Sequence, residues 1–364
     1  MELVTTPKQD GFTFPAEFAS QQAVWLAWPE RQDNWRDDAK PAQQAFAKVA
    51  NEINQVVPVT VVVSERQRED AKVLLEPSIQ IAVMPYNDAW MRDIGPTIVT
   101  NAQGEKRGIS WQFNAWGGNY NGLYSPWNDD DNLAAKVCDH LGIDHYRAPF
   151  VLEGGAFHSD GEGTLYTTAE CLLSPGRNPE LSQKDIEQYL AEYLGITKVI
   201  WLPKGLFNDE TDGHVDNLLH VIAPGKVVLS WTDDINDPQY LISREALRVL
   251  VNSLDAQGRT IEVIKLPIPG PLYLQEHEAA GIAPSQGMKR LAGERLGGSY
   301  ANFLMINKTV FLPELDSLTD PMAKSILQNA LPDYNIVGIP TREVLLGGGN
   351  IHCITQQIPA GGTT

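Results

Sequence analysis

Cys353 lies close to the C-terminus, after a run of three glycines, in the segment 347–357. Glycines let the backbone approach a ligand closely and adopt conformations that other residues avoid. A thiol in such a loop is expected to act as a nucleophile rather than as a packing group. The other cysteines, Cys138 and Cys171, fall in a helical and in a strand-like pattern, so we interpret them as buried structural side chains.

Three upstream segments contain acids and a histidine that could work with this thiol. They hold Trp90 and Asp93 in WMRDIGP, Glu153 in LEGG, and Glu210, His214 and Asp216 in NDETDGHVDN. Cysteine, histidine and glutamate are the residue types of a nucleophile, a general acid–base and its orienting group. Two aspartates beyond these suit a planar guanidinium, because carboxylates match its N–H donors in pairs. A thiol protease would have no use for the two extra anions.

Each of these residues also has a structural interpretation. Glu153 could bind the backbone amides of the two glycines after it, and Asp93 could pair with Arg92. His214 and Asp216 stand two apart at a probable strand start, hence on one face, and could hold a metal. We predict no metal, because the other histidines are scattered along the sequence and supply no further ligand set. A shared site is favoured, since the candidates occur in corresponding loops of a repeat.

The repeat consists of five units, each with a helical pattern, a short apolar strand and a proline. The prolines are Pro85, Pro149, Pro203, Pro267 and Pro340, and the predicted helices span 66–75, 128–141, 182–194, 239–254 and 320–331. Hairpins are predicted to follow, with 156–159 paired to 164–168, 215–222 to 227–231, and 301–306 to 309–312. Such units indicate internal pseudo-symmetry. Their post-proline loops would then gather at one end and form a central site.

One domain is predicted for residues 1–364, because no Gly/Ser-rich linker divides the chain. Residues 1–57, with a helix near 41–55, would belong to the first unit. The fourth loop is a long insert, 268–297, for which a lid and a surface decoration are both open interpretations.

The chain of 364 residues is acidic, with 28 Lys and Arg against 46 Asp and Glu and a formal net charge of −18. Such a field repels nucleic acid and anionic membranes and suits a small cationic ligand. Three cysteines argue against a disulfide framework and for a reducing compartment. The N-terminus shows no signal peptide, and no apolar stretch approaches the ~20 residues of a membrane span, so we expect a cytoplasmic protein.

Taken together, the WMRDIGP, LEGG, GHVDN and GGGNIHC segments resemble those of the agmatine deiminase (agmatine iminohydrolase) family, in the guanidine-modifying, or pentein, superfamily. The resemblance covers nearly the whole chain, in the same order. It implies a five-bladed, pseudo-symmetric α/β propeller built of ββαβ units. It also implies hydrolysis of agmatine to N-carbamoylputrescine and ammonia, a step towards putrescine, without a cofactor and in a homo-oligomer.

The resemblance further implies a role for each site residue. Cys353 would attack the guanidinium carbon and form a covalent thiouronium intermediate. His214 would protonate the departing ammonia and then activate the water, while Glu153 orients its ring. Asp93 and Asp216 would hold the guanidinium nitrogens.

Two further residues are predicted to contact the substrate. Glu210 is expected near the distal amine, because acidic surroundings favour a diamine-like molecule. Trp90 is expected to pack on the alkyl chain or the cation, with ordinary core packing as the alternative. A free thiol has a pKa of about 8.5, so we also expect the substrate cation or His214 to favour the thiolate of Cys353.

Three other functions stay open. A bacterial peptidylarginine deiminase would carry the same core segments, although no secretion signal is visible. A non-catalytic binder of cations would bind guanidinium compounds without turnover. A thiol protease would cleave peptides and would tolerate the substitution Asp93→Asn.

Overall fold

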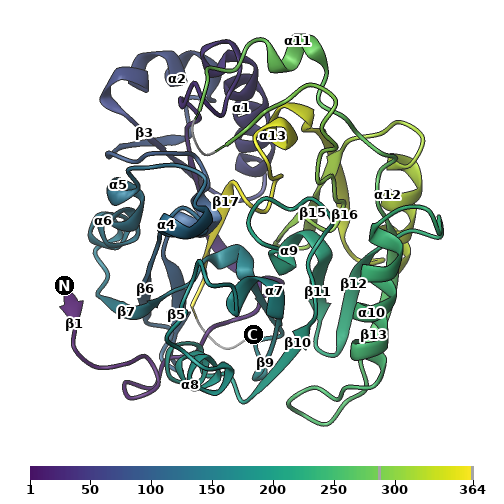
Figure 1. The fold of residues 1–364 in the computed structure, drawn as a ribbon. Coiled ribbons are helices and arrows are strands. Elements are labelled where there is room, and N and C mark those ends of the chain that lie inside the picture. The colour runs from purple at the N-terminus through teal and green to yellow at the C-terminus, as the bar shows by residue number, and fades with distance from the viewer. Residues whose placement is uncertain (286–287, 362–364) are drawn as a thin grey trace.

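The chain folds into a mixed α/β structure. The computed structural model describes residues 1–285 and 288–361. Residues 286–287 of the predicted insert and 362–364 of the predicted domain therefore lie outside the described residues. Within the described ranges, the strands form five small sheets (Figure 1).

The sheets share one plan. The first has the order β17 (Thr355–Pro359), β2 (Gln21–Ala27), β3 (Val59–Val63) and β4 (Gln80–Val83). The second has the order β1 (Glu2–Leu3), β7 (His145–Val151), β6 (Lys106–Gln112) and β5 (Thr97–Thr100). The third sheet has the order β10 (Lys198–Leu202), β9 (Thr164–Thr168) and β8 (Phe157–Ser159). The fourth has the order β11 (Leu219–Ala223), β12 (Lys226–Trp231) and β13 (Glu262–Pro267). The fifth has the order β14 (Leu304–Ile306), β15 (Thr309–Glu314) and β16 (Asn335–Pro340). Each contains an antiparallel pair followed by a parallel strand.

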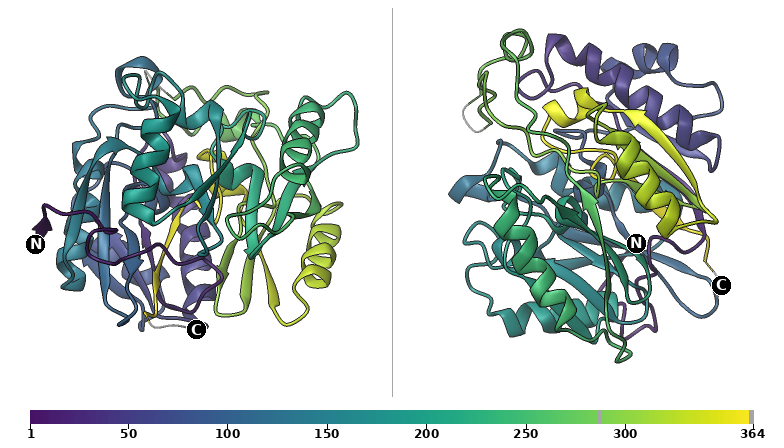
Figure 2. Two further views of the ribbon diagram at one scale, coloured as in Figure 1. Left: turned by 90° about the horizontal axis from the view of Figure 1, so that it is seen from below. Right: turned by 90° about the vertical axis from the view of Figure 1, so that its right-hand side faces the viewer.

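A helix joins each antiparallel pair to its parallel strand, which is the ββαβ order. The connecting helices are α1 (Lys40–Asn54), α6 (Leu133–Leu141), α8 (Gln183–Leu194), α10 (Gln239–Val251) and α12 (Asp320–Ala330). They lie around the outside in Figure 1, whereas β17 lies near the middle. Figure 2 shows α10 and α12 at the periphery from two further directions. The helices predicted at 128–141, 182–194, 239–254 and 320–331 are confirmed in position.

Local sequence signals explain where the helices begin and end. The side chain of Ser182 accepts a hydrogen bond from the backbone N–H of Asp185, and Asp185 accepts one in return, so α8 begins with a capping box. Gly195 ends it with φ = 76°, a left-handed conformation that glycine adopts without steric cost.

The first unit differs from its prediction. The helix expected at 66–75 forms as η2 (Glu65–Gln67) and α2 (Arg68–Leu74). It connects β3 to β4, and β4 is an additional parallel strand that the other units lack. The helix that corresponds to those of the other units is α1, between β2 and β3. β17 pairs with β2, so the first sheet is built from both ends of the chain. A linear repeat search misses this pairing, because its two strands are far apart in sequence.

Several predicted strands are shorter or are helical. Residues 215–218 form the helical turn α9 (Val215–Leu218), and residues 301–303 precede β14. Cys171 lies in another short helix, α7 (Ala169–Leu172), and not in a strand. The hairpin of β8 and β9 is confirmed, whereas β7 continues past its proline to Val151. Short apolar runs fit a strand and a buried helical turn equally well, so periodicity cannot separate them.

Short helical turns precede the first strands of four sheets. They are α3 (Met91–Ile94) before β5, η3 (Gly154–Ala156) before β8, α9 before β11 and α13 (Arg342–Leu346) before β17. The segments that connect one sheet to the next are called crossings below. They contain the predicted site residues. Further short helices are η1 (Asp37–Ala39), α4 (Gly118–Asn121), α5 (Asn128–Asp131) and α11 (Glu276–Ala279). In the described part of the chain, no helix has the length and apolar character needed to cross a bilayer.

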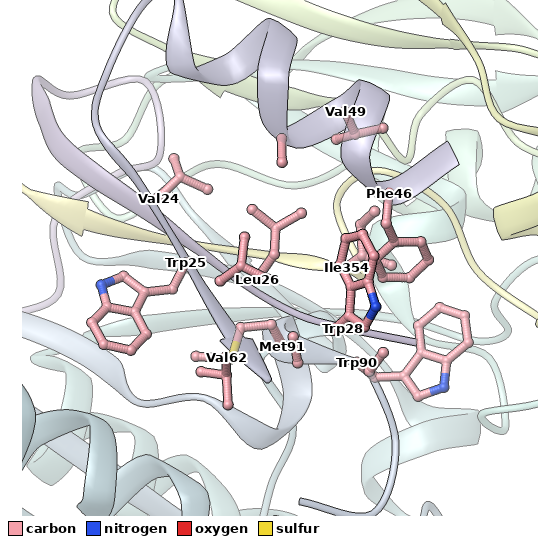
Figure 3. Close-up of a cluster of buried hydrophobic side chains, with 14 of the residues drawn as sticks. Val24, Trp25, Leu26, Trp28, Phe46, Val49, Val62, Trp90, Met91 and Ile354 are labelled. Carbon is pink, nitrogen blue, oxygen red and sulfur yellow. The ribbon is translucent and has the colours of Figure 1, made fainter. Parts of the chain in front are cut away.

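One buried apolar cluster fixes two of these crossings at once. Figure 3 shows Trp28, Phe46, Trp90 and Ile354 within it, so it joins β2, α1 and the segments around Trp90 and Cys353. Full burial of such side chains stabilises the fold by about 1.5–3 kcal/mol each. The positions of the tryptophan and of the thiol therefore depend on the same core.

Candidate active site

The thiol of Cys353 lies in a buried polar environment. Its residue is only 7% exposed. The side-chain amide of Asn302 donates to Sγ over 3.1 Å, and the Asn302 carbonyl oxygen accepts from the Cys353 backbone N–H over 3.3 Å. Oδ2 of Asp216 lies 3.5 Å from the same sulfur. The sequence predicted the thiol and Asp216, but not Asn302.

The two predicted aspartates face the same glycine. Oδ1 of Asp93 accepts a hydrogen bond from the Gly155 backbone N–H over 2.8 Å, and Oδ2 accepts one from Trp116 Nε1 over 2.9 Å. A Cβ on Gly155 would lie 2.6 Å from Nδ1 of His214, 2.9 Å from Asp216 and 3.0 Å from Asp93. The absence of a side chain at this position is therefore what allows the three groups to converge.

His214 lies between two carboxylates. Its Nδ1 is 3.8 Å from Oδ2 of Asp93, and its Nε2 is 3.6 Å from Oε2 of Glu153. The residue is the N-cap of α9, and Asp216 is the second residue of that helix, in its first turn. The prediction that both lie at a strand start was wrong, because a helical turn places them.

Glu153 is held by an arginine that the sequence analysis missed. Nε of Arg177 donates to Oε1 of Glu153 over 2.7 Å, and both side chains are fully buried. The same guanidinium donates to the Thr211 carbonyl over 2.7 Å and to Asp212 over 3.0 Å. Through these hydrogen bonds Arg177 connects Glu153 to the loop before His214. A buried carboxylate needs such a partner, because burying an unpaired charge is costly.

The electrostatics favour the protonated thiol. Burial raises the pKa of Cys353 well above its ordinary value, and the carboxylates of Asp216 and Asp93 raise it further. Burial also raises the pKa of Asp93. A cation placed between the two aspartates would oppose these effects and favour the thiolate.

The electrostatics also favour the charged form of His214. Burial lowers its pKa, but the Asp93 carboxylate and the Cys171 sulfur outweigh burial, and the pKa lies well above the ordinary value. For Glu153, burial raises the pKa, yet Arg177 and His214 more than compensate and hold it below the ordinary value. The resulting pair is an imidazolium beside a carboxylate, which suits a proton donor.

The histidines that looked scattered in the sequence come together behind this site. The rings of His158, His220 and His352 lie with centroids 4.3 to 5.4 Å apart. Nδ1 of His352 donates to Oδ2 of Asp216 over 2.8 Å, and its Nε2 donates to Glu17 over 2.8 Å. The three histidines therefore lie together in space, and the expectation that they supply no further ligand set was wrong.

This histidine cluster is already tied to a carboxylate. Glu17 contacts His352 and lies 3.4 Å from Nε2 of His220. Imidazole and carboxylate are ligand types of zinc, and ring nitrogens of the three histidines lie within 4.8 Å of one another. Arg92, buried and 3.7 Å from Glu17, places a positive charge beside them. That charge disfavours a cation, and the expectation of no metal stays a prediction.

A cavity leads to the thiol. It offers about 340 Å³ of empty space, including its open mouth. Its walls include Trp90, Asp93, Trp116, Glu210, Met288, the glycines 347–349 and Cys353. A Cβ on Gly349 would lie 2.6 Å from the Trp90 ring and 3.0 Å from Cβ of Cys353. The absence of a side chain at Gly349 therefore allows the Trp90 ring to lie near the thiol.

Trp90 is both a core residue and a cavity wall. It is 5% exposed, and its Nε1 donates to Oδ2 of Asp88 over 3.0 Å. Asp88 also accepts from Trp35 Nε1 over 2.8 Å and from the Asn34 amide over 3.0 Å. The two interpretations of Trp90 in the sequence are therefore compatible.

Glu210 lines the cavity but is not alone there. It forms an ion pair with Arg290, which comes from the long insert 268–297. The insert also contributes Met288 to the cavity wall. The described part of the insert therefore contributes to the cavity wall and is not surface decoration alone.

Comparison with known proteins shows the family. Residues 13–359 match the model described as Porphyromonas-type peptidyl-arginine deiminase. The chain is a member of this family. A Vibrio parahaemolyticus protein named "Putative agmatine deiminase" is 66% identical over 99% of this chain and 100% of its own.

Solved structures of similar proteins agree with this family. The agmatine deiminase of Enterococcus faecalis has 47% identity and a TM-score of 0.96, covering 98% of this chain and 99% of that one. The agmatine deiminase of C. jejuni has 25% identity and a TM-score of 0.80, covering 97% of each chain. The resemblance seen in the sequence is confirmed, as is the expectation of a hydrolase that acts on C–N bonds.

In this family member the segment before β14 also contributes a residue to the site, which the sequence did not indicate. Asn302 precedes β14 by two residues, as Cys353 precedes β17. Asp93, Glu153 and Asp216 likewise precede the first strands of their sheets by three or four residues. Position within the repeated unit is therefore the signal for Asn302, because an amide does not stand out by residue type as acids, histidines and thiols do.

Proposed function

We propose that this protein hydrolyses agmatine to N-carbamoylputrescine and ammonia. The observation that carries the proposal is the placement of two carboxylates, Asp93 and Asp216, around a buried thiol, Cys353. Their spacing around Gly155 suits a flat cation with N–H donors on both sides. The names of the relatives, which include agmatine deiminases from Vibrio parahaemolyticus and Enterococcus faecalis, support this substrate.

The first half of the reaction forms a covalent intermediate. The guanidinium settles between the two aspartates, and its charge favours the thiolate of Cys353. Sulfur attacks the guanidinium carbon, and a C–S bond forms while the carbon becomes tetrahedral. His214, which is held protonated by its carboxylate neighbours, gives its proton to one nitrogen. The C–N bond breaks, ammonia leaves, and a thiouronium stays on the enzyme.

The second half is hydrolysis of that thiouronium. The neutral His214 accepts a proton from water as the oxygen attacks the same carbon. The C–S bond then breaks, the electron pair returns to sulfur, and the ureido product leaves. Glu153, fixed by Arg177, keeps the imidazole in place through both halves.

The finer structural expectations belong to the same proposal. We propose that the five sheets are the blades of a pseudo-symmetric propeller, because each repeats the ββαβ order and the site forms where the chain crosses between sheets. A single domain spanning 1–364, a homo-oligomer, a cytoplasmic location, no cofactor and no nucleic-acid or membrane partner stay predictions.

The experiment that tests the activity measures ureido product from agmatine, arginine and peptide-bound arginine, with wild type and Cys353→Ser. Turnover of agmatine that is lost in the variant is the expected result. Turnover of peptide-bound arginine instead would favour the second candidate, a peptidylarginine deiminase, which the family description suggests. Met288, which comes from the insert, lines the cavity, and this disfavours a bulky substrate.

Equal formation of ureido product by wild type and by Cys353→Ser would contradict the role of Cys353 as the nucleophile. Binding of agmatine without product would leave a cation-binding protein. Cleavage of a peptide bond would indicate a thiol protease.

A further inference from the structure

His352, the residue before Cys353, is bound by a carboxylate at each end of its ring. Its Nδ1 donates to Oδ2 of Asp216 over 2.8 Å, and its Nε2 donates to Oε2 of Glu17 over 2.8 Å. Only an imidazolium donates from both ring nitrogens. Burial lowers the pKa of this ring, as does the charge of Arg92, but the two carboxylates outweigh them and hold the pKa above its ordinary value. The ring is therefore a buried cation shared between two acids.

The second of these acids, Glu17, is fixed by the framework of the fold. Its Oε1 accepts a hydrogen bond from the Met305 backbone N–H, in β14, over 2.8 Å. The same oxygen lies 3.4 Å from Nε2 of His220, and Arg92 lies 3.7 Å from the other oxygen. The far end of the His352 ring is therefore attached to the fifth sheet through Glu17.

The bond to His352 makes the two oxygens of Asp216 unequal. Oδ2 accepts from His352 and lies 3.5 Å from Sγ of Cys353. Oδ1 is buried and has no hydrogen-bond partner among residues 1–285 and 288–361. Leaving a buried acceptor without a donor is costly. Asp93 differs, because both of its oxygens already accept from the protein. Oδ1 of Asp216 is therefore an acceptor that remains for a donor of the ligand.

We propose that His352 is a positioning residue, which holds Oδ2 of Asp216 so that Oδ1 stays available to an N–H of the guanidinium. The inference rests on the proposed binding of a guanidinium between the aspartates. Because His352 and Cys353 are adjacent, one stretch of backbone sets both the place of the thiol and the orientation of the carboxylate. The charge of the imidazolium also offsets that of Oδ2 beside the sulfur, where an unpaired anion would oppose the thiolate.

The other two histidines of the cluster have different surroundings. The His158 ring lies 4.9 Å from that of His352, and its Nε2 has no hydrogen-bond partner in the described part of the chain. Nδ1 of His220 lies 3.2 Å from the Ala301 carbonyl oxygen. Of the three rings, only that of His352 forms a hydrogen bond with Asp216 within the described ranges. His158 therefore offers a matched control, in the same cluster but without the bond.

Loss of the imidazolium should also change the ionisation of Asp216. Burial raises the pKa of this carboxyl, but His352, followed by His214 and Arg92, holds it below the ordinary value. Without His352, the carboxylate should take up a proton at higher pH. The other charged or titratable groups around the pair are Glu17, His158 and His220 on the side of His352, and Asp93 and Cys353 on the side of Asp216.

The test measures agmatine binding by calorimetry from pH 5 to pH 8, in a Cys353→Ser background that does not depend on turnover. With His352→Gln, we expect the Kd to rise by about 10-fold or more at neutral pH, because a charge-assisted hydrogen bond is lost. The pH below which binding weakens should also move up, by about one unit or more. His158→Gln should change neither quantity. Thermal unfolding of each variant identifies any that has lost its fold.

A second measurement needs no substitution at His352. Nitrogen NMR of the Cys353→Ser protein, with labelled histidine, reports whether the ring nitrogens of His352 carry protons. Both are expected to be protonated at pH 7. A neutral His352 ring would overturn the inference, even if His352→Gln did not fold.

The results separate this inference from the proposed function. If wild type makes no ureido product and Cys353→Ser does not bind agmatine, the proposed function fails and the inference fails with it. If agmatine is bound and turned over, while His352→Gln changes the Kd by less than about threefold and leaves its pH dependence in place, only the positioning role is overturned. An equal loss of binding with His158→Gln would also overturn it, because the cluster would then act through packing alone.

Discussion

Asn302 binds Cys353 twice, through its amide nitrogen to Sγ over 3.1 Å and through its carbonyl oxygen to the backbone N–H over 3.3 Å. One side chain therefore orients the thiol and stabilises its anion. Asn302 comes from the crossing before β14, whereas Cys353 comes from the crossing before β17. The sulfur of Cys353 is thus held by a segment about 50 residues away in sequence.

Replacement of Asn302 by alanine should slow the enzyme. The amide lowers the pKa of the thiol, in opposition to burial and the two aspartates. Its loss should raise that pKa and reduce kcat/KM by about 10- to 100-fold. The measurement is the pH dependence of alkylation of Cys353 by iodoacetamide, which should move to higher pH in the variant. An unchanged alkylation profile would mean that the amide has only a structural role.

Gly155→Ala should reduce activity about 100-fold with a small effect on the fold. The added Cβ would lie within 3.0 Å of His214, Asp216 and Asp93, so at least one of them must move. A displacement of this size commonly costs 10²-fold in rate. Steady-state rates and circular dichroism check the prediction, with Gly270→Ala as the control, because the nearest atom there is a flexible carboxylate oxygen of Asp316 at 3.2 Å. Equal loss of activity in both variants would argue against a specific clash.

Arg177→Met should destabilise the protein strongly. The variant leaves Glu153 fully buried without its 2.7 Å partner. Breaking a buried pair from one side costs about 3–5 kcal/mol. Urea unfolding measures this loss, and Glu153→Gln in the same chain should recover part of it. If the double variant is no more stable than Arg177→Met alone, the coupling between the two side chains is absent.

Asp130 should make the stability of the fold depend on pH. Burial raises its pKa to about 7, although the hydroxyl of Tyr124 and backbone N–H groups bind it. An aspartate in the unfolded chain has a pKa of about 3.9. Between these values the folded state binds more protons, so this group's contribution to stability falls as pH rises towards about 7 and then levels off.

Asp130→Asn should remove that slope. The difference in the free energy of unfolding between the variant and wild type should change with pH. From pH 5 to pH 8 it should shift in favour of the variant by about 2 kcal/mol. Urea unfolding at both pH values measures the change. Asp129→Asn is the control, because its side chain is 50% exposed. A difference between variant and wild type that does not vary with pH would rule out the raised pKa.

The residue types in the sequence and their repeated positions predicted the candidate site. Residue types at corresponding positions of the repeated helix–strand–proline units pointed to Cys353, His214, Glu153, Asp93 and Asp216. The structure brings all five together, and Asp93 and Cys353 line the cavity. This was possible because the units recur along the chain, so that corresponding loops could be compared.

The residues that support those five became visible only in the folded protein. Arg177, Asn302 and Glu17 lie in segments without a distinctive pattern, and their roles depend on contacts across different sheets. The pairing of β17 with β2 and the position of Arg290 beside Glu210 are likewise long-range contacts. Local periodicity reports on neighbours along the chain, whereas a buried charge or thiol takes its partner from whatever the fold brings within about 3 Å.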